Sequence, residues 1–298
     1  MSLPSRFVFI IGAPKSGTTS LAEWLNARPD MAYCAGKEPR FFTDFAGRDW
    51  KGPDAKAFLS SMYTDEAAYL AGFPDDPAVT WAIDGSTDYL WCEASPALLK
   101  DWSARYPSKL ICILRDPVER AISEYQHTLR DSLETLSFQE ALAAEEDRIQ
   151  QGWQPLFYHQ RRSLYADAVA RYRETFGSDL LVLDYHELRD PEACLKKVTD
   201  FLGVPYQMTI QNERQNISYV YSNPVVGRTM NNKGLRALAR AVFPPALRAR
   251  IRGFVTQKAT TKFQATDQDR QAIHALLAGD IAKCRADADI PTGNWSGL

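Results

Sequence analysis

The chain has 298 residues, of which 45% are hydrophobic, 24% are charged and 11% are aromatic. This composition is that of an ordinary globular protein and excludes the disordered and fibrous classes. The formal net charge is −2, which argues against nucleic acid or a membrane surface as a partner of the whole molecule.

Short apolar runs without polar alternation are typical of parallel strands that are covered on both faces. Such runs predict strands at residues 6–12, 79–84, 109–115 and 179–185. Helical patterns follow or separate them at residues 18–27, 137–151, 163–176 and 191–202. The alternation predicts an α/β fold in which helices flank one P-loop-like, doubly wound parallel sheet, in a single domain over residues 1–298. Ligands of such sheets bind at the carboxyl ends of the strands.

The first predicted strand runs into the stretch "GAPKSGTTS", residues 12–20, where a turn leads to the first helix. Gly12 and Gly17 have the spacing of a P-loop, but Lys15 precedes the second glycine instead of following it. Free N–H groups at the start of a helix form an anion site, and Gly17 allows close approach of the backbone. A cation and four hydroxyls add to this site: Lys15, Ser16, Thr18, Thr19 and Ser20. The turn therefore predicts phosphate binding.

Residues 40–78 form an aromatic-rich stretch with several glycine and proline breaks. Long irregular insertions are often functional, so we interpret this one as a lid or as a wall of an acceptor site. The alternative is an excursion of the chain that only packs against the core.

A second strand-to-helix turn occupies "CILRDPVERAISEYQHTL", residues 112–129. Asp116 suits a helix N-cap, Pro117 the first helical position, and Glu119 a capping-box partner. Helical spacing places an apolar stripe on one face, and Arg120, Ser123 and His127 on the other. Arg115 and Ser123 are candidates to hold a second phosphate, because arginine offers a planar set of donors. The alternative for Arg115 is a pair with a core carboxylate.

The C-terminal region, residues 214–298, is predicted to be helical and basic. Residues 214–262 contain ten lysines or arginines and no acidic residue. This segment is either a cationic wall for an anionic ligand or a solvated helical face.

The two turns, in this order and separation, resemble those of sulfotransferases that use 3′-phosphoadenosine 5′-phosphosulfate (PAPS). "PKSGTTSL" (14–21) resembles the family's phosphosulfate loop, and "RDPVERAIS" (115–123) resembles its 3′-phosphate motif. "KEPRFF" (37–42) and "YQH" (125–127) are similar to segments of the heparan-sulfate-type branch, which contains N- and 3-O-sulfotransferases of carbohydrates. The stretch at 180–204 resembles the family's last strand and helix.

The resemblance implies PAPS as donor, 3′-phosphoadenosine 5′-phosphate (PAP) as product and no required metal. It assigns Lys15 the role of stabilising the negative charge that develops on the bridging oxygen as the sulfuryl group leaves. Glu38, within "KEPRFF", becomes the general base, and His127 is a second candidate for that role. Arg228 and Lys233, in a stretch similar to the family's later 3′-phosphate loop, become further nucleotide contacts.

The resemblance has one notable departure. In the stretch "DGSTDYL" (84–90), Gly85 stands where heparan 3-O-sulfotransferases carry a lysine, which argues against a sulfated glycosaminoglycan as acceptor. The favoured acceptor is a hydroxyl or amine of a carbohydrate or glycosylated small molecule. Two alternatives stay open: a P-loop kinase that uses Mg-ATP, with Asp84 or Asp184 as metal ligands, and a non-catalytic nucleotide-binding module.

Five scattered cysteines form no C-x-x-C pair and no Cys/His cluster, which argues against a zinc site and favours a reducing compartment. The N-terminus lacks the pattern of a signal peptide, and no apolar run approaches 18 residues. We therefore expect a cytoplasmic protein without integral membrane contact.

Overall fold

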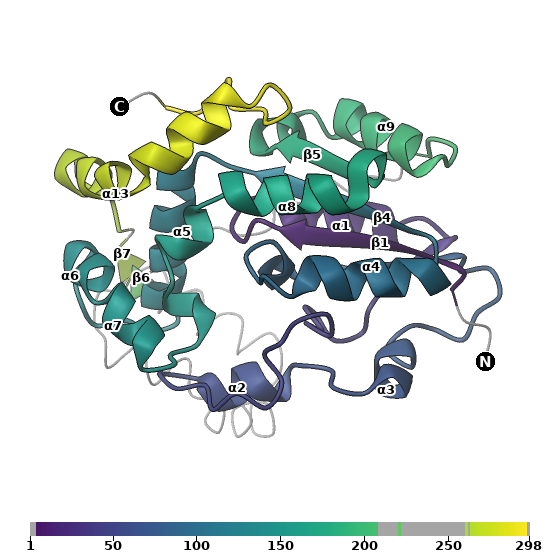
Figure 1. The fold of residues 1–298 in the computed structure, drawn as a ribbon, viewed down its shortest axis with the longest axis horizontal. Helices are drawn as coiled ribbons and strands as arrows, with labels where there is room; N and C mark the ends of the chain where they lie inside the picture. Colours follow the sequence, from purple (N-terminus) through teal and green to yellow (C-terminus); the bar gives the residue numbers. More distant parts are fainter. Residues whose placement is uncertain (1–3, 208–219, 222–259, 262, 297–298) are drawn as a thin grey trace.

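The computed structural model describes residues 4–207, 220–221, 260–261 and 263–296. Its centre is a parallel five-stranded sheet with the strand order β2-β3-β1-β4-β5 (Figure 1). The strands are β1 (Arg6–Gly12), β2 (Met31–Tyr33), β3 (Trp81–Asp84), β4 (Ser108–Leu114) and β5 (Leu180–Asp184). The strand order reverses between β1 and β4, and ligands of doubly wound sheets bind at such a switch point. The two turns singled out in the sequence leave the sheet on either side of it.

Helices cover both faces of the sheet because alternate side chains of each strand point to opposite faces. On one face, Phe7 and Phe9 of β1 pack with α4 (Ser95–Arg105) and α8 (Ala166–Phe176). On the other face, Val8 and Ile10 pack with α1 (Thr18–Asn26) and α9 (Pro191–Leu202). Figure 1 shows α4 and α8 in front of the sheet. The predicted flanked parallel sheet is therefore confirmed.

A third hydrophobic cluster joins α5 (Pro117–Arg130), α6 (Phe138–Ala143) and α13 (Asp267–Ala286) beside the sheet. The start of α5 is capped by Asp116, whose Oδ1 accepts from the backbone N–H groups of Val118 and Glu119. The other elements are α2 (Ala55–Ser60), α3 (Glu66–Leu70), α7 (Glu145–Gln150), the antiparallel pair β6 (Val220–Tyr221) and β7 (Thr260–Thr261), and the short 3₁₀ helices Thr87–Tyr89, Pro155–Phe157, Arg161–Ser163, Gly177–Asp179 and Tyr185–Arg189.

Two differences from the predicted elements concern helices. The expected helix at 137–151 begins with the predicted capping box of Ser137 and Glu140, but it is divided at Ala144 into α6 and α7. The expected helix at 163–176 begins at Ala166, because residues 161–163 form a 3₁₀ turn. The sequence patterns also did not indicate β2 or α4.

The aromatic insertion at 40–78 contributes directly to packing. Phe42 and Tyr69 are buried in the main core against Phe9 and its neighbours. Phe45 and Trp50 belong to a smaller buried cluster under the insertion. The packing interpretation therefore holds for these four side chains, and a role as lid or acceptor-site wall stays a prediction for the other residues of the segment.

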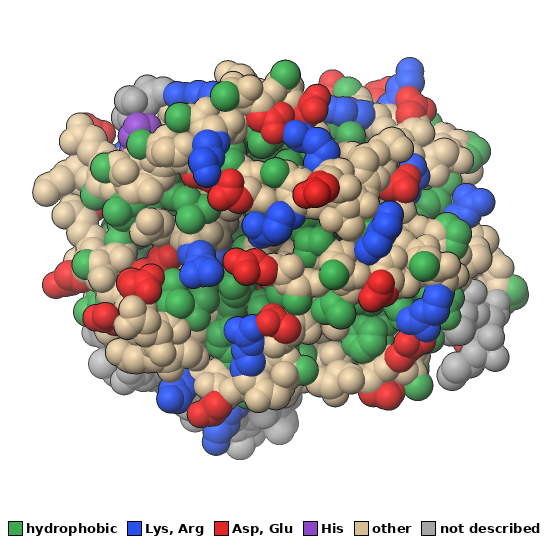
Figure 2. Space-filling model, viewed as in Figure 1, with side chains coloured by type: hydrophobic (Ala, Val, Ile, Leu, Met, Phe, Trp, Pro, Cys, Tyr) green, Lys and Arg blue, Asp and Glu red, His purple; other side chains and the backbone are tan. Residues whose placement is uncertain are grey.

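Over the described part of the face seen in Figure 2, acidic and basic side chains are interspersed. This distribution matches the small net charge of the whole chain. Among the helices that the structure describes, none combines the length and the apolar character needed to span a bilayer.

Candidate active site

The turn after β1 is shaped by two glycines. Gly17 is the N-cap of α1 and has a φ of 81°, a left-handed conformation that favours glycine. A Cβ added at Gly17 would lie 2.6 Å from Leu188 Cδ2, and one at Gly12 would lie 2.7 Å from Leu90 Cβ. Neither position has room for a side chain, so glycine lets Leu188 and Leu90 pack directly against the turn that leads into α1.

Ser16 and Lys15 make this turn suitable for an anion. Ser16 is fully buried, yet its Oγ has no hydrogen-bond partner among the residues that the structure describes. A buried hydroxyl without a partner is costly, so the partner of Ser16 is to be sought beyond the described residues, and a bound anion is one that the turn suits. The pKa of Lys15 falls from 10.5 to about 8, mainly because burial desolvates the ammonium group and also because Arg130 lies nearby.

The turn after β4 touches the turn after β1. Arg115 Nη1 donates to the carbonyl oxygen of Lys15 at 3.2 Å, and the guanidinium lies 4.9 Å from the centre of the Tyr185 ring. Among the described residues it pairs with Glu119, whose Oε2 is 3.8 Å from Arg115 Nη2 and whose side chain is one-third exposed. Within the part of the chain that the structure describes, Arg115 therefore does not form the alternative pair with a core carboxylate. Glu119 does not close the expected capping box either, since it pairs with Arg270.

The polar face of α5 differs from the helical-spacing prediction at one position. Ser123 and His127 are half-buried, but Arg120 is fully buried and its Nη1 lies 2.8 Å from Glu124 Oε2. His127 Nε2 lies 3.1 Å from Asp131 Oδ2. Burial lowers the pKa of His127, with Asp131 opposing and Lys15 adding to the shift, so the imidazole is neutral at neutral pH.

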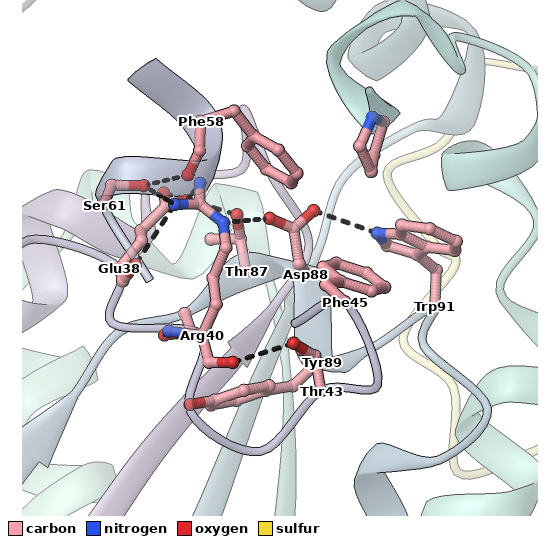
Figure 3. Close-up of polar contacts among 12 residues, drawn as sticks. Glu38, Arg40, Thr43, Phe45, Phe58, Ser61, Thr87, Asp88, Tyr89 and Trp91 are labelled. Atoms are coloured by element: carbon pink, nitrogen blue, oxygen red, sulfur yellow. Dashed lines mark hydrogen bonds and ion pairs between the residues drawn. The ribbon is translucent and has the colours of Figure 1, made fainter. Parts of the chain in front are cut away.

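Glu38 lies in a loop next to the first turn. Lys37 Nζ donates to Thr19 Oγ1 at 3.2 Å, which links this loop to the start of α1. Glu38 Oε2 accepts from Arg40 Nη2 at 2.5 Å, and Glu38 Oε1 is 3.4 Å from Thr87 Oγ1 (Figure 3). The Glu38 side chain is 21% exposed, so its carboxylate is both held by the protein and accessible.

The space beside Gly85 is filled by an aromatic side chain. A Cβ at Gly85 would lie 2.7 Å from the hydroxyl oxygen of Tyr33, which comes from the end of β2. Burial, together with the nearby Asp84 and Glu38, raises the pKa of Tyr33, so the phenol remains a hydrogen-bond donor. Any side chain at position 85 would have to displace Tyr33.

The two carboxylates considered as metal ligands are occupied by donors of the chain. Asp84 is buried and accepts from Tyr69 Oη, Tyr89 Oη and Ser86, and burial raises its pKa to about 6. Asp184 caps the 3₁₀ helix at Tyr185–Arg189 and accepts from Asn294 Nδ2 at 2.6 Å. Among the described residues, no group of three or more His, Cys, Asp or Glu side chains converges as metal ligands.

The sequence patterns did not indicate a row of paired charged residues, some fully and some partly buried, that links the Glu38 loop to α5. Its members alternate in sign and bridge the 37–42 loop to α5; they are Glu38, Arg40, Asp88, Arg162, Glu124 and Arg120. The motif "KEPRFF" drew attention to Arg40, but no pattern in the sequence around it predicts a pair with Asp88. Arg228, Lys233 and most of the basic segment at 214–262 lie outside the described residues.

Comparison with known proteins gives consistent matches. A family model described as "Sulfotransferase family" matches residues 7–208. Heparan sulfate glucosamine 3-O-sulfotransferase 3B1 of Mus musculus is 30% identical over 202 residues, which cover 65% of this chain and 45% of that protein. Heparan sulfate glucosamine 3-O-sulfotransferase 6 of Mus musculus is 25% identical over 276 residues, covering 87% of this chain and 71% of that protein.

A solved structure extends the match over most of the chain. The crystal structure of a sulfotransferase from Alicyclobacillus acidocaldarius is 29% identical, with a TM-score of 0.66, and the match covers 93% of this chain and 97% of that one. By contrast, the chain spans less than half the length of the 3B1 relative.

Proposed function

The chain belongs to the sulfotransferase family, and from this membership we propose that it transfers a sulfuryl group from PAPS to a hydroxyl or amine of an acceptor. The observation that carries the proposal is the pairing of two cationic turns at the ends of neighbouring strands. The first has Lys15 and the unpartnered Ser16 Oγ at the N-terminus of α1, and the second has Arg115. PAPS carries a phosphosulfate and a 3′-phosphate, so a donor with two separate anionic groups fits two such turns.

The residues present fit this donor. The turn 15–20 offers backbone N–H groups, the Ser16, Thr18, Thr19 and Ser20 hydroxyls and the Lys15 ammonium for the phosphosulfate. Arg115 and Ser123 face the 3′-phosphate, with Arg228 and Lys233 as further contacts. PAPS supplies an activated sulfuryl group when it is bound, and PAP leaves as the second product.

Lys15 acts in this proposal by stabilising charge. Its pKa of about 8 leaves it cationic at neutral pH, and an anion in the turn raises that pKa further. A cation held in a partly desolvated site interacts strongly with negative charge that develops on a leaving oxygen. The chemistry asks for no metal in this scheme, because Lys15 and the helix N-terminus provide the positive field.

Glu38 is the proposed general base, and His127 is the alternative. The Glu38 carboxylate is accessible and lies in the loop that Lys37 joins to Thr19. The neutral imidazole of His127 can also accept a proton. We propose a carbohydrate or glycosylated small molecule as acceptor, which is supported by two relatives whose names specify heparan sulfate glucosamine. The five free, buried cysteines favour a reducing, cytoplasmic environment.

Calorimetry and a transfer assay test the proposal. We expect tight binding of PAP in the presence of EDTA, and weaker binding of ADP with or without magnesium. Incubation with ³⁵S-labelled PAPS and a panel of amino sugars, oligosaccharides and phenols is expected to label at least one acceptor. Binding of ADP that depends on magnesium and exceeds that of PAP would overturn the proposal in favour of a kinase. PAP binding without transfer to any acceptor or to water would favour a non-catalytic module.

A further inference from the structure

Arg40 is held by an unusually complete set of contacts. Its Nε donates to Asp88 Oδ2 at 2.5 Å, and its Nη2 donates to Glu38 Oε2 at 2.5 Å (Figure 3). Its Nη1 donates to the Glu38 carbonyl oxygen at 3.1 Å and to Ser61 Oγ at 3.0 Å. The guanidinium also lies over the ring of Phe58 at 4.9 Å. Four hydrogen bonds to the chain use most of the five N–H donors that an arginine has.

This arrangement fixes the backbone that carries Glu38. Glu38 and Arg40 have φ values of 55° and 51°, in the left-handed region that costs a non-glycine residue about 1 kcal/mol or more. The Arg40 guanidinium bonds the Glu38 carbonyl, and the Arg40 backbone N–H donates to Ser86 Oγ at 3.0 Å. Thr43 Oγ1 donates to the Arg40 carbonyl at 2.8 Å. Hydrogen bonds of both side chains and backbone therefore hold this strained loop in place.

Asp88 anchors the Arg40 side chain. It is buried and is shared by two arginines, because Oδ1 lies 2.8 Å from Arg162 Nη2 while Oδ2 accepts from Arg40. Trp91 Nε1 also donates to Asp88 Oδ1 at 3.0 Å. Burial alone would raise the pKa of Asp88, but Arg162 and Arg40 hold it below its ordinary value. Arg162 in turn binds Glu124 of α5 at 2.5 Å. Asp88 and Arg162 thus connect the Arg40 side chain to α5.

Resting on the proposed function, we propose that Arg40, anchored by Asp88, is a positioning residue that aims the Glu38 carboxylate at the acceptor. Arg40 holds Glu38 Oε2, whereas the contact of Oε1 within the described part of the chain is the long one of 3.4 Å with Thr87 Oγ1. Oε1 is therefore the oxygen that takes the proton from the acceptor. In that step the acceptor oxygen bonds to sulfur, the bond from sulfur to the 5′-phosphate oxygen breaks, and its electron pair stays on PAP.

The same contacts argue against a role of Arg40 in binding the acceptor. An arginine that recruits an anionic acceptor presents free donors to it, whereas the donors of Arg40 are directed at Glu38, Asp88 and Ser61. Burial alone would lower the pKa of Arg40, but the charges of Glu38 and Asp88 raise it, so the cation is balanced within the protein. Arg40 is accordingly expected to affect turnover rather than acceptor affinity.

A reaction with water as acceptor tests this inference without a known acceptor. The readout is release of ³⁵S-sulfate from PAPS in Arg40→Lys, Asp88→Asn, Glu38→Gln and the double variant Arg40→Lys/Glu38→Gln. We expect kcat to fall by about 10²-fold or more in Glu38→Gln, and by about 10-fold in Arg40→Lys and in Asp88→Asn. The double variant should be no slower than Glu38→Gln, because Arg40 acts through Glu38. KM for PAPS and the Kd for PAP should stay within about twofold in each variant.

Arg48→Lys is the matched control, since Arg48 lies in the same insertion, is 50% exposed and pairs with Asp44, four residues before it. It should leave turnover unchanged. Equal further loss from Arg40→Lys in the Glu38→Gln background would overturn the inference, as would unchanged hydrolysis in Arg40→Lys. Loss of PAP affinity in Arg40→Lys and Asp88→Asn alike would show a structural role and overturn it as well. If the wild-type chain binds PAP but consumes no PAPS, it is the proposed function that fails, and the inference falls with it.

Discussion

Arg115 donates from Nη1 to the carbonyl oxygen of Lys15 at 3.2 Å, so the turn after β4 holds the turn after β1. The two residues are far apart in the sequence, but β1 and β4 are adjacent parallel strands and end at the same edge of the sheet. One N–H of Arg115 therefore holds the backbone at Lys15, while Arg115 Nη2 lies 3.8 Å from Glu119 Oε2. In the proposed function, the same residue shapes the first turn and binds the 3′-phosphate at the second.

This double role predicts a selective loss of affinity in Arg115→Lys. A lysine keeps the charge but loses the planar donors, so contact with the 3′-phosphate should weaken. We expect the Kd for PAP to rise about 10-fold or more, while the Kd for AMP, which lacks the 3′-phosphate, rises only about twofold. Calorimetry with both nucleotides measures the ratio. Equal losses for PAP and AMP would show that Arg115 acts only through the Lys15 backbone.

The pKa of Lys15 predicts proton uptake on nucleotide binding. At pH 8 about half of the free molecules carry a neutral Lys15, and a bound phosphate raises its pKa. Binding of PAP should therefore take up roughly half a proton at pH 8 from this group and almost none at pH 6.5. Above pH 8, PAP affinity should fall by up to about tenfold per pH unit.

Calorimetry in buffers with different ionisation enthalpies measures this uptake. Lys15→Arg is the control, because arginine stays charged throughout this range and should lack the uptake at pH 8. Subtracting the variant from the wild type also removes the protons that belong to the nucleotide phosphates. An uptake of the same size in both proteins would contradict the prediction.

Two glycines with the same positive φ allow the effect of backbone strain to be told apart from an effect on binding. Gly17 and Gly47 both have a φ of 81°, but a Cβ at Gly47 would meet nothing within 4 Å, whereas one at Gly17 would press on Leu188. Replacement of either by alanine should lower the free energy of unfolding by about 1–2 kcal/mol. Only Gly17→Ala should weaken PAP binding, by about 10-fold or more, because it displaces N–H groups at the start of α1. Comparable loss of PAP affinity in Gly47→Ala would count against this site.

Local patterns predicted the elements and turns that depend on neighbouring residues. Four strands followed from continuous apolar runs, and the N-cap at Asp116 followed from residue type. The three-residue strand Met31–Tyr33 has no run long enough to detect, and it forms because β3 supplies its partner. Helical spacing placed Arg120 beside Ser123 and His127, but spacing does not show which partners cover a face.

The partners that matter most for the site come from distant parts of the chain. Arg40 finds Asp88 and Ser61, and Arg162 joins Asp88 to Glu124 on α5. No spacing rule connects these residues, because tertiary packing alone brings them together. The sequence motif therefore identified Glu38 as a candidate general base, whereas the contacts that hold Glu38 can be seen only in the folded structure.

The unpartnered hydroxyl of Ser16 predicts opposite effects on stability and on binding. Ser16→Ala removes a buried polar atom that has no partner among the described residues, so the free protein should be equally stable or up to about 1 kcal/mol more stable. In the proposed site the same change removes a donor to the 5′-phosphate, which PAPS and PAP share, and should raise the Kd for PAP about 5–20-fold. Urea unfolding and calorimetry on one preparation measure both quantities.

Ser95 provides the matched comparison. It is equally buried, but its Oγ donates to the Phe42 carbonyl at 2.6 Å. Ser95→Ala should therefore lower the free energy of unfolding by about 1–2 kcal/mol and leave PAP affinity unchanged, the reverse of the Ser16 result. If Ser16→Ala destabilised the free protein as much as Ser95→Ala does, the hydroxyl would have a structural partner, and the site would lose the observation that indicates an external ligand. A gain or no change in stability with a loss of PAP affinity ties Ser16 to the donor.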